Sequence, residues 1–295
     1  MSMNPAKQAT RGATHQAVTP ELRRWIVEQV QAGFGAEAVL QSMRASGWQE
    51  DVAIAALEAT LRDFAEQQAR ANGLPPASRV PEPALDDSPL YLDAGDRRVH
   101  VLSAMFNPRV VVFGNLLSDE ECDGLIAAAR PRMARSLTVA TKTGGEELNE
   151  SRTSNGMFFQ RGESDLVTRI EARLARLVNW PVENGEGLQI LQYGPGAEYK
   201  PHYDYFDPNE PGTPTILKRG GQRVGTIVMY LSEPEKGGGT TFPDVFVEVA
   251  PKRGNAVFFS YERPHASTRT LHGGSPVIAG EKWIATKWLR ERRFD

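Results

Sequence analysis

The second half of the chain is a succession of short β-rich segments separated by glycine and proline turns. β-Branched and aromatic residues are common in these segments, and few helical patterns lie between them. Many short strands with few helices favour two packed sheets or a closed barrel. The sequence therefore predicts a mainly β core of the jelly-roll kind with flanking helices. The expected strands are 98–102, 110–113, 188–193, 198–205, 223–231, 239–242, 246–249, 255–260, 276–279 and 282–289.

Two helices are expected before most of these strands. Ser118 and Glu121 have the spacing of a capping box, which predicts a helix over 119–129. A second helix is predicted over 164–178, because apolar residues recur there at helical spacing. The side chains on that apolar face are Leu166, Ile170, Leu174 and Leu177.

The N-terminal part has a different organisation. Residues 1–18 are polar and aperiodic, so we expect a mobile tail. Residues 19–64 contain three apolar repeats at helical spacing, separated by glycines, which predicts a three-helix unit. The unit resembles the ubiquitin-associated type of small helical bundle in length and in its Gly-Phe-Gly and Gly-Trp punctuation. A structural or docking role without ubiquitin is the preferred interpretation.

A proline-rich stretch follows the helical unit. Residues 65–97 contain Pro75, Pro76, Pro81, Pro83 and Pro89 among serines and aspartates. This composition predicts an extended, semi-rigid linker and a domain boundary. The β-rich domain is accordingly expected over 98–295.

Charge and cysteine content exclude several classes of function. A formal net charge of -3 and a pI near 6.0 give no overall reason to expect nucleic acid as a partner. Cys122 is the sole cysteine, so neither an intrachain disulfide nor a cysteine zinc cluster can form. No stretch has the pattern of a signal peptide or membrane span. We expect a cytoplasmic protein with no membrane partner.

The segment around His202 and Asp204 carries the clearest chemical signal. The two residues alternate on a predicted strand, so their side chains should project from the same face. A second histidine from a distant strand would complete a two-histidine, one-carboxylate iron site with open positions for cosubstrate and oxygen.

The chain has five histidines, so the third ligand must come from the four that remain besides His202. His15 and His100 lie outside the β-rich region, which leaves His265 in a turn-like stretch and His272 at an expected strand edge. A 2-oxoglutarate enzyme also needs a basic residue for the far carboxylate of the cosubstrate. Lys282 lies ten residues after His272, whereas a serine lies ten residues after His265. This offset favours His272.

From about Asn107 to Leu289 the chain resembles the prolyl 4-hydroxylase family of iron(II)- and 2-oxoglutarate-dependent dioxygenases, of the bacterial type, with a double-stranded β-helix core. The resemblance depends on several blocks that occur in the family's order. The blocks are Leu117–Cys122, Ser151–Met157, Leu188–Gly194, Pro201–Phe206, Gly220–Val224, Gly237–Thr240 and His272–Trp288. Membership implies Fe(II), 2-oxoglutarate and O2, with ascorbate as a reductant that rescues oxidised iron.

The resemblance also implies roles for individual residues. His202, Asp204 and His272 would hold the iron. Lys282 would pair with the distal carboxylate of 2-oxoglutarate, and Tyr193 and Thr240 match positions that hydrogen-bond the same group.

On the substrate side, Arg223 and Trp288 match positions of the peptide groove and the active-site wall. Arg152 to Ser154 resemble a mobile segment that closes over peptide, and residues 142–150 would suit a flexible lid. The resemblance implies hydroxylation of a prolyl residue in a protein or peptide.

Two rival functions stay open. The same chemistry could act on another amino acid or a small molecule, with a nucleobase disfavoured by Lys282 and the acidic charge. Alternatively, the chain could be a non-catalytic metal-binding sensor or interaction module, in which residues 19–64 dock onto a protein. Residues 207–218 and the N-terminal unit depart from the family's usual pattern, at places where substrate choice could change.

Overall fold

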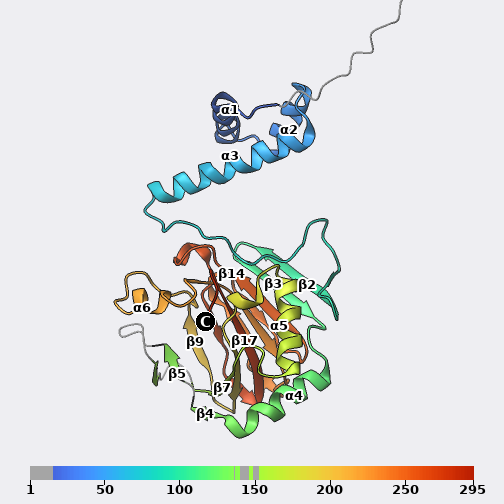
Figure 1. Cartoon of the computed structure of the whole chain (residues 1–295), viewed down its shortest axis with the longest axis vertical. Coiled ribbons are helices and arrows are strands. Elements are labelled where there is room, and N and C mark those ends of the chain that lie inside the picture. Colours follow the sequence, from blue (N-terminus) through green and yellow to red (C-terminus); the bar gives the residue numbers. More distant parts are fainter. Residues whose placement is uncertain (1–15, 136, 140–145, 149–152) are drawn as a thin grey trace, which may run out of the picture. The chain divides into compact units, whose positions relative to one another are not determined.

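The computed structural model describes residues 16–135, 137–139, 146–148 and 153–295 (Figure 1). The chain divides into two compact units, Met1–Pro76 and Ala77–Asp295. No helix among the described residues combines the length and the apolar character needed to span a membrane.

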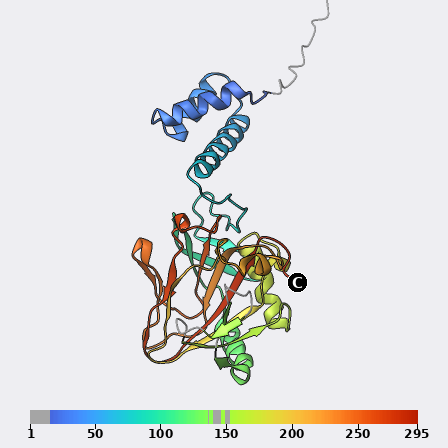
Figure 2. The ribbon, with the colours of Figure 1, turned by 90° about the vertical axis from the view of Figure 1, so that its left-hand side faces the viewer.

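The first unit contains three helices, α1 (Pro20–Gln31), α2 (Ala36–Ala45) and α3 (Glu50–Ala71). Thr19 caps α1, since its side chain accepts a hydrogen bond from the backbone N–H of Leu22. α1 and α2 pack against α3 around a small apolar core (Figures 1 and 2). α3 continues beyond the expected end at Phe64, because the first glycine that can end it with a positive φ is Gly73.

The proline-rich stretch is divided between the two units. Its first residues, up to Ala71, are helical, and the part from Ala77 onward packs on the β-rich domain. Pro81 lies so close to Gly225 that a Cβ on that glycine would meet the proline ring at 2.6 Å. Strand β1 (Tyr91–Asp93) also pairs with β2 (Arg98–Phe106). Proline content indicated an extended backbone, but it carried no information on whether that backbone packs.

The second unit is built around two sheets. Among the described residues, the large sheet has the strand order β1-β2-β3-β14-β10-β17-β8-β7-β4, and the small sheet has the order β13-β12-β15-β9. Short ribbons β5-β6 and β11-β16 complete the pairing. The remaining strands are β3 (Arg109–Gly114), β4 (Ala134–Arg135), β5 (Leu137–Val139), β6 (Glu146–Leu148), β7 (Asn155–Phe159), β8 (Leu188–Tyr193), β9 (Tyr199–His202), β10 (Arg223–Tyr230), β11 (Lys236–Gly237), β12 (Thr240–Phe242), β13 (Val247–Val249), β14 (Ala256–Ser260), β15 (His272–Gly274), β16 (Val277–Ala279) and β17 (Lys282–Arg290).

Helices α4 (Asp119–Ala129) and α5 (Asp165–Leu177) lie where the capping and periodicity patterns predicted them. The capping box of Ser118 and Glu121 is present in both directions. A short helix not predicted from the sequence, α6 (Thr213–Leu217), lies within the stretch 207–218 after Asp204. Single 3₁₀ turns lie at Arg130–Arg132, Val182–Asn184, Pro243–Val245 and Ala266–Thr268.

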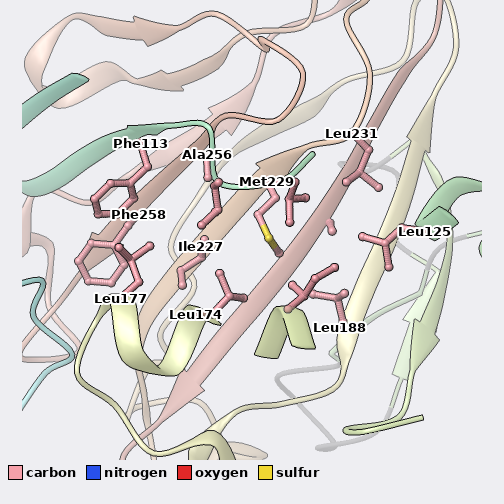
Figure 3. Close-up of a cluster of buried hydrophobic side chains, with 14 of the residues drawn as sticks. Phe113, Leu125, Leu174, Leu177, Leu188, Ile227, Met229, Leu231, Ala256 and Phe258 are labelled. Carbon is pink, nitrogen blue, oxygen red and sulfur yellow. The ribbon is translucent and has the colours of Figure 1, made fainter. Parts of the chain in front are cut away.

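The two faces of the large sheet have different roles. Because side chains alternate along a strand, Ile227 and Met229 of β10 point toward the helices, where they pack with Leu174 of α5 (Figure 3). Val228, between them, points to the other side and joins a second apolar cluster with Phe242 of the small sheet. The core is therefore a mainly β double-stranded β-helix with helices on one outer face, as the sequence predicted. A pocket between the two sheets is lined by residues of both.

Candidate metal centre and cosubstrate pocket

Three side chains predicted as metal ligands meet between the sheets. His202 and His272 occupy directly paired positions on the neighbouring strands β9 and β15. Asp204 lies between them: its carboxylate oxygens are 3.5 Å from Nε2 of His202 and 3.4 Å from Nε2 of His272. One donor atom from each residue lies within 4.8 Å of the other two.

The donor set fits a metal ion. Nδ1 of His202 lies 2.9 Å from the backbone carbonyl of Lys200, and Nδ1 of His272 lies 3.0 Å from that of Thr270. A carbonyl oxygen can only accept, so each Nδ1 carries the proton and donates it. Both Nε2 atoms therefore keep a free lone pair facing the shared centre, the arrangement expected of metal-binding histidines.

The charge states point the same way. Burial alone would raise the pKa of the Asp204 carboxyl. The neighbouring His272 and His202 lower it by more than burial raises it, so the pKa lies well below the usual value. Burial lowers the pKa of His202, and the neighbouring His272 contributes in the same direction. The site consequently holds one carboxylate beside a neutral imidazole, which are the protonation states that bind Fe(II).

One structural expectation was wrong in detail. β9 ends at His202, so Asp204 lies in a bend beyond the strand. Its carboxylate is instead held by Thr226 of β10, whose hydroxyl donates to it over 2.7 Å. The rival histidine, His265, belongs neither to this cluster nor to the described lining of the pocket. Its Nδ1 accepts a hydrogen bond from the backbone N–H of Ser267 at 3.0 Å.

Lys282 lies in the same pocket as the three ligands. Its side chain is 3% exposed, and its backbone pairs with that of Tyr193 on β8. The ammonium is 5.4 Å from the centre of the Tyr193 ring and 6.0 Å from that of Tyr230, and it has no hydrogen-bond acceptor among the described residues. Burial lowers the pKa of Lys282 to about 8. A buried cation without an acceptor is suited to an anionic ligand.

Thr240 also faces this pocket, from β12. Its hydroxyl accepts a hydrogen bond of 2.8 Å from the Tyr230 hydroxyl. Tyr193, Thr240 and Lys282 thus surround one end of the pocket, as the resemblance implied, and their contact with 2-oxoglutarate stays a prediction. The described residues that line the pocket are Leu191, Tyr193, Tyr199, His202, Asp204, Thr226, Val228, Thr240, His272, Gly273, Gly274, Lys282, Ile284, Thr286 and Trp288.

Of the residues predicted to bind substrate, Trp288 lines the pocket and Arg223 does not. The buried indole Nε1 of Trp288 has no hydrogen-bond partner in the part of the chain that the structure describes. The guanidinium of Arg223 lies 4.0 Å from the centre of the Trp288 ring, and its nitrogens bond both carboxylate oxygens of Glu186 at 2.7 and 2.9 Å. Arg223 thus packs on the ring of a residue that lines the pocket. Of the expected lid, residues 142–150, only strand β6 (Glu146–Leu148) is described, and it pairs with β5; Arg152 and the rest of that stretch lie outside the described residues.

Several site residues were missed from the sequence. Thr226 and Tyr230 could have been found, because they alternate on β10 with residues that face the helices. Tyr199, whose ring stacks on that of His202 with centroids 3.7 Å apart, lies at the start of the predicted ligand strand. Glu186 had no local signal, since its role depends on Arg223, which is distant in the sequence.

Comparisons with known proteins agree with this geometry. The model of the 2OG-Fe(II) oxygenase superfamily matches residues 188–290. Prolyl 4-hydroxylase 5 of Arabidopsis thaliana is 42% identical over 221 residues, covering 68% of this chain and 74% of that protein. Prolyl 4-hydroxylase 1 of the same plant is 39% identical and covers 71% of this chain and 77% of its own length.

A solved structure, the viral collagen prolyl hydroxylase of Paramecium Bursaria Chlorella virus-1 with 2OG, superposes with a TM-score of 0.48 at 31% identity. The match covers 61% of this chain and 95% of the viral one. The two relatives above are plant proteins, so the narrower expectation of a bacterial type has no support in them. Their identity and coverage show that the chain belongs to the prolyl 4-hydroxylase family of Fe(II)- and 2-oxoglutarate-dependent oxygenases.

Proposed function

We propose that the protein hydroxylates prolyl residues of a protein or peptide, with Fe(II) and 2-oxoglutarate. The observation that carries this proposal is the presence, in one pocket, of the His202, Asp204 and His272 cluster and the buried cation of Lys282. The plant relatives named prolyl 4-hydroxylases supply the substrate class.

Each part of the pocket has a distinct task. The two histidines and Asp204 hold the metal, which when bound supplies the chemistry that couples oxidative decarboxylation of 2-oxoglutarate to hydroxylation of a substrate carbon. Lys282 binds the distal carboxylate, with Tyr193 and Thr240 beside it. Trp288 forms a wall against which a prolyl ring can pack, and the apolar residues Leu191, Val228 and Ile284 keep water out.

The experiment is a turnover assay with proline-containing peptides, in which peptide mass and released succinate are both measured. We expect the peptide to gain one oxygen atom on proline, with dependence on Fe(II). His272→Ala should abolish this gain, and His265→Ala should retain it. The proposed substrate class would be wrong if succinate were released and a free amino acid or small molecule were hydroxylated, but no peptide was.

We further propose that ascorbate sustains turnover by reducing iron that is oxidised in cycles without substrate hydroxylation. This proposal follows from family membership. The number of turnovers before inactivation should rise with ascorbate, while the initial rate stays unchanged. An unchanged turnover number would remove ascorbate from the cofactors of this protein.

We also propose that residues 19–64 dock a protein partner and that the enzyme acts in the cytoplasm. The compact unit that ends at Pro76 has its own apolar core, which supports a separable role. A chain starting at Ala77 should hydroxylate short peptides at the full rate but lose activity on a folded protein substrate. Equal activity of both chains on every substrate would contradict a docking role.

A further inference from the structure

The position of Asp204 raises the question of what orients its carboxylate. The two histidine ligands are fixed by strand pairing between β9 and β15, but Asp204 follows the end of β9. The position of its backbone is therefore not fixed by strand pairing in the small sheet. A ligand outside regular structure needs side-chain contacts to keep its orientation.

The contact that Asp204 receives comes from the large sheet. Thr226 is fully buried on β10, a central strand paired on both sides by β14 and β17. Its hydroxyl lies 2.7 Å from Oδ2 of Asp204. Because an ionised carboxylate only accepts, the single hydroxyl proton of Thr226 must point to Asp204.

The Thr226 hydroxyl is itself hydrogen-bonded to a second hydroxyl, that of Tyr261. The Tyr261 hydroxyl lies 3.0 Å from Oγ1 of Thr226. Since Thr226 has used its proton on Asp204, Tyr261 must be the donor of this bond, and the chain of hydrogen bonds has one direction. Burial and the nearby Asp204 carboxylate raise the pKa of Tyr261 well above the usual value, so it keeps its proton.

Tyr261 is itself firmly placed. It is 1% exposed, and its backbone N–H donates to the carbonyl of Val224 at 3.1 Å. The ring packs against that of Tyr205 with centroids 6.2 Å apart and an edge-to-face inclination. Both members of the hydrogen-bond chain are therefore anchored in, or directly beside, the large sheet.

We propose that Tyr261 and Thr226 form a hydrogen-bond relay that orients the Asp204 carboxylate for metal binding. By holding Oδ2, Thr226 fixes the rotation of the carboxylate that would meet a metal between His202 and His272. Both are positioning residues, because neither is itself a ligand. The inference rests on the metal site of the proposed function, and it extends that site from the small sheet to the large one.

The test is the affinity of the full-length protein for Mn(II), measured by calorimetry without 2-oxoglutarate, together with the melting temperature of the metal-free protein. Thr226→Val removes the hydroxyl at nearly constant volume and should weaken Mn(II) binding by about 10- to 100-fold. Thr226→Ser keeps the hydroxyl and should bind Mn(II) as the unmodified protein does. Thr213→Val is the matched control, because it removes another buried threonine hydroxyl, bonded to Asp207 at 2.6 Å, and should leave the affinity unchanged.

A double-mutant cycle tests the relay itself. Tyr261→Phe should weaken Mn(II) binding less than Thr226→Val does, and the double variant should match Thr226→Val, because Tyr261 acts through Thr226. Losses that add in the double variant, or unchanged affinity in Thr226→Val, would overturn the proposal. If Thr226→Val does not fold, Tyr261→Phe decides: unchanged affinity at an unchanged melting temperature contradicts the relay.

The same data separate this inference from the proposed function. A protein that binds Mn(II) with this pattern but hydroxylates no prolyl peptide keeps the relay and loses the proposed substrate. A protein that hydroxylates prolyl peptide but shows no effect of Thr226→Val on Mn(II) affinity keeps the function and loses the relay.

Discussion

The two sheets of the β-rich unit contribute differently to the site. The small sheet supplies both histidine ligands from strands of only three and four residues, with Asp204 directly beyond one of them. The large sheet supplies Lys282 and Thr226 from strands of nine and eight residues that are buried along their whole length. Short strands make few ladder bonds, so the small sheet depends more on side-chain support.

This difference suggests a division of labour. The small sheet supplies the two histidine ligands, and the large sheet supplies the cation for the cosubstrate and the hydrogen bond that orients Asp204. Substitution of Lys282 should therefore change the KM for 2-oxoglutarate without changing metal binding, whereas substitution of a histidine ligand or of Thr226 should change metal binding itself. The predictions below test that separation.

The largest effect is expected in the small sheet. His202→Ala or His272→Ala removes a ligand from a site that offers one carboxylate and two imidazoles, so metal-dependent succinate release should be abolished. Metal affinity measured separately should fall in parallel. His265→Ala is the control, and retention of full activity in His272→Ala would refute the ligand assignment.

In the large sheet, Lys282→Met should raise the KM for 2-oxoglutarate by about 10- to 100-fold, because a hydrogen bond to a charged group contributes roughly 1.5–3 kcal/mol. Affinity for Mn(II) in the absence of 2-oxoglutarate should be unchanged. Loss of metal affinity in this variant would show that Lys282 supports the metal site as well as the cosubstrate.

The same lysine predicts a pH dependence. Burial lowers the pKa of Lys282 to about 8, and Glu248 offsets only part of that effect. The protonated form binds the carboxylate and the neutral form does not, so the KM for 2-oxoglutarate should rise by about tenfold for each pH unit above the pKa. Lys282→Arg should remove this rise, since guanidinium stays charged. A pH profile shared by both proteins would assign the titration to another group.

The smallest effect is expected at Tyr230. Tyr230→Phe removes the donor to Thr240 and should raise the KM for 2-oxoglutarate by about 2- to 10-fold, as a neutral hydrogen bond contributes roughly 0.5–1.5 kcal/mol. The metal affinity should again be unchanged. An effect as large as that of Lys282→Met would show that the tyrosine contacts the cosubstrate directly.

The sequence predicted the features that depend on local pattern. Strand β8 and helix α4 have the predicted bounds, because alternation and a capping box are local signals. The spacing to Lys282 led to the choice of His272 over His265 as the third ligand, but the pairing of β9 with β15 that brings it to His202 was not predicted. Strand β7 and helix α6 were missed, since each is short and stabilised by neighbours distant in the chain.

The parts of the site that were missed depend on tertiary contacts. The bond from Thr226 to Asp204 requires the two sheets to face each other, and no spacing along the chain encodes that distance. The role of Glu186 depends in the same way on Arg223 and Arg290, which flank it in space on β10 and β17. The packing of residues from Ala77 onward could not be read from proline content alone.

The most direct test of the central claim is the fate of molecular oxygen. A proline-containing peptide is incubated with the protein, Fe(II), 2-oxoglutarate and isotopically labelled O2, and both products are analysed by mass spectrometry. We expect one labelled atom in succinate and one on a prolyl residue, in equal amounts, and neither in His272→Ala. Labelled succinate without a labelled prolyl residue, across a broad set of peptides, would contradict prolyl hydroxylation.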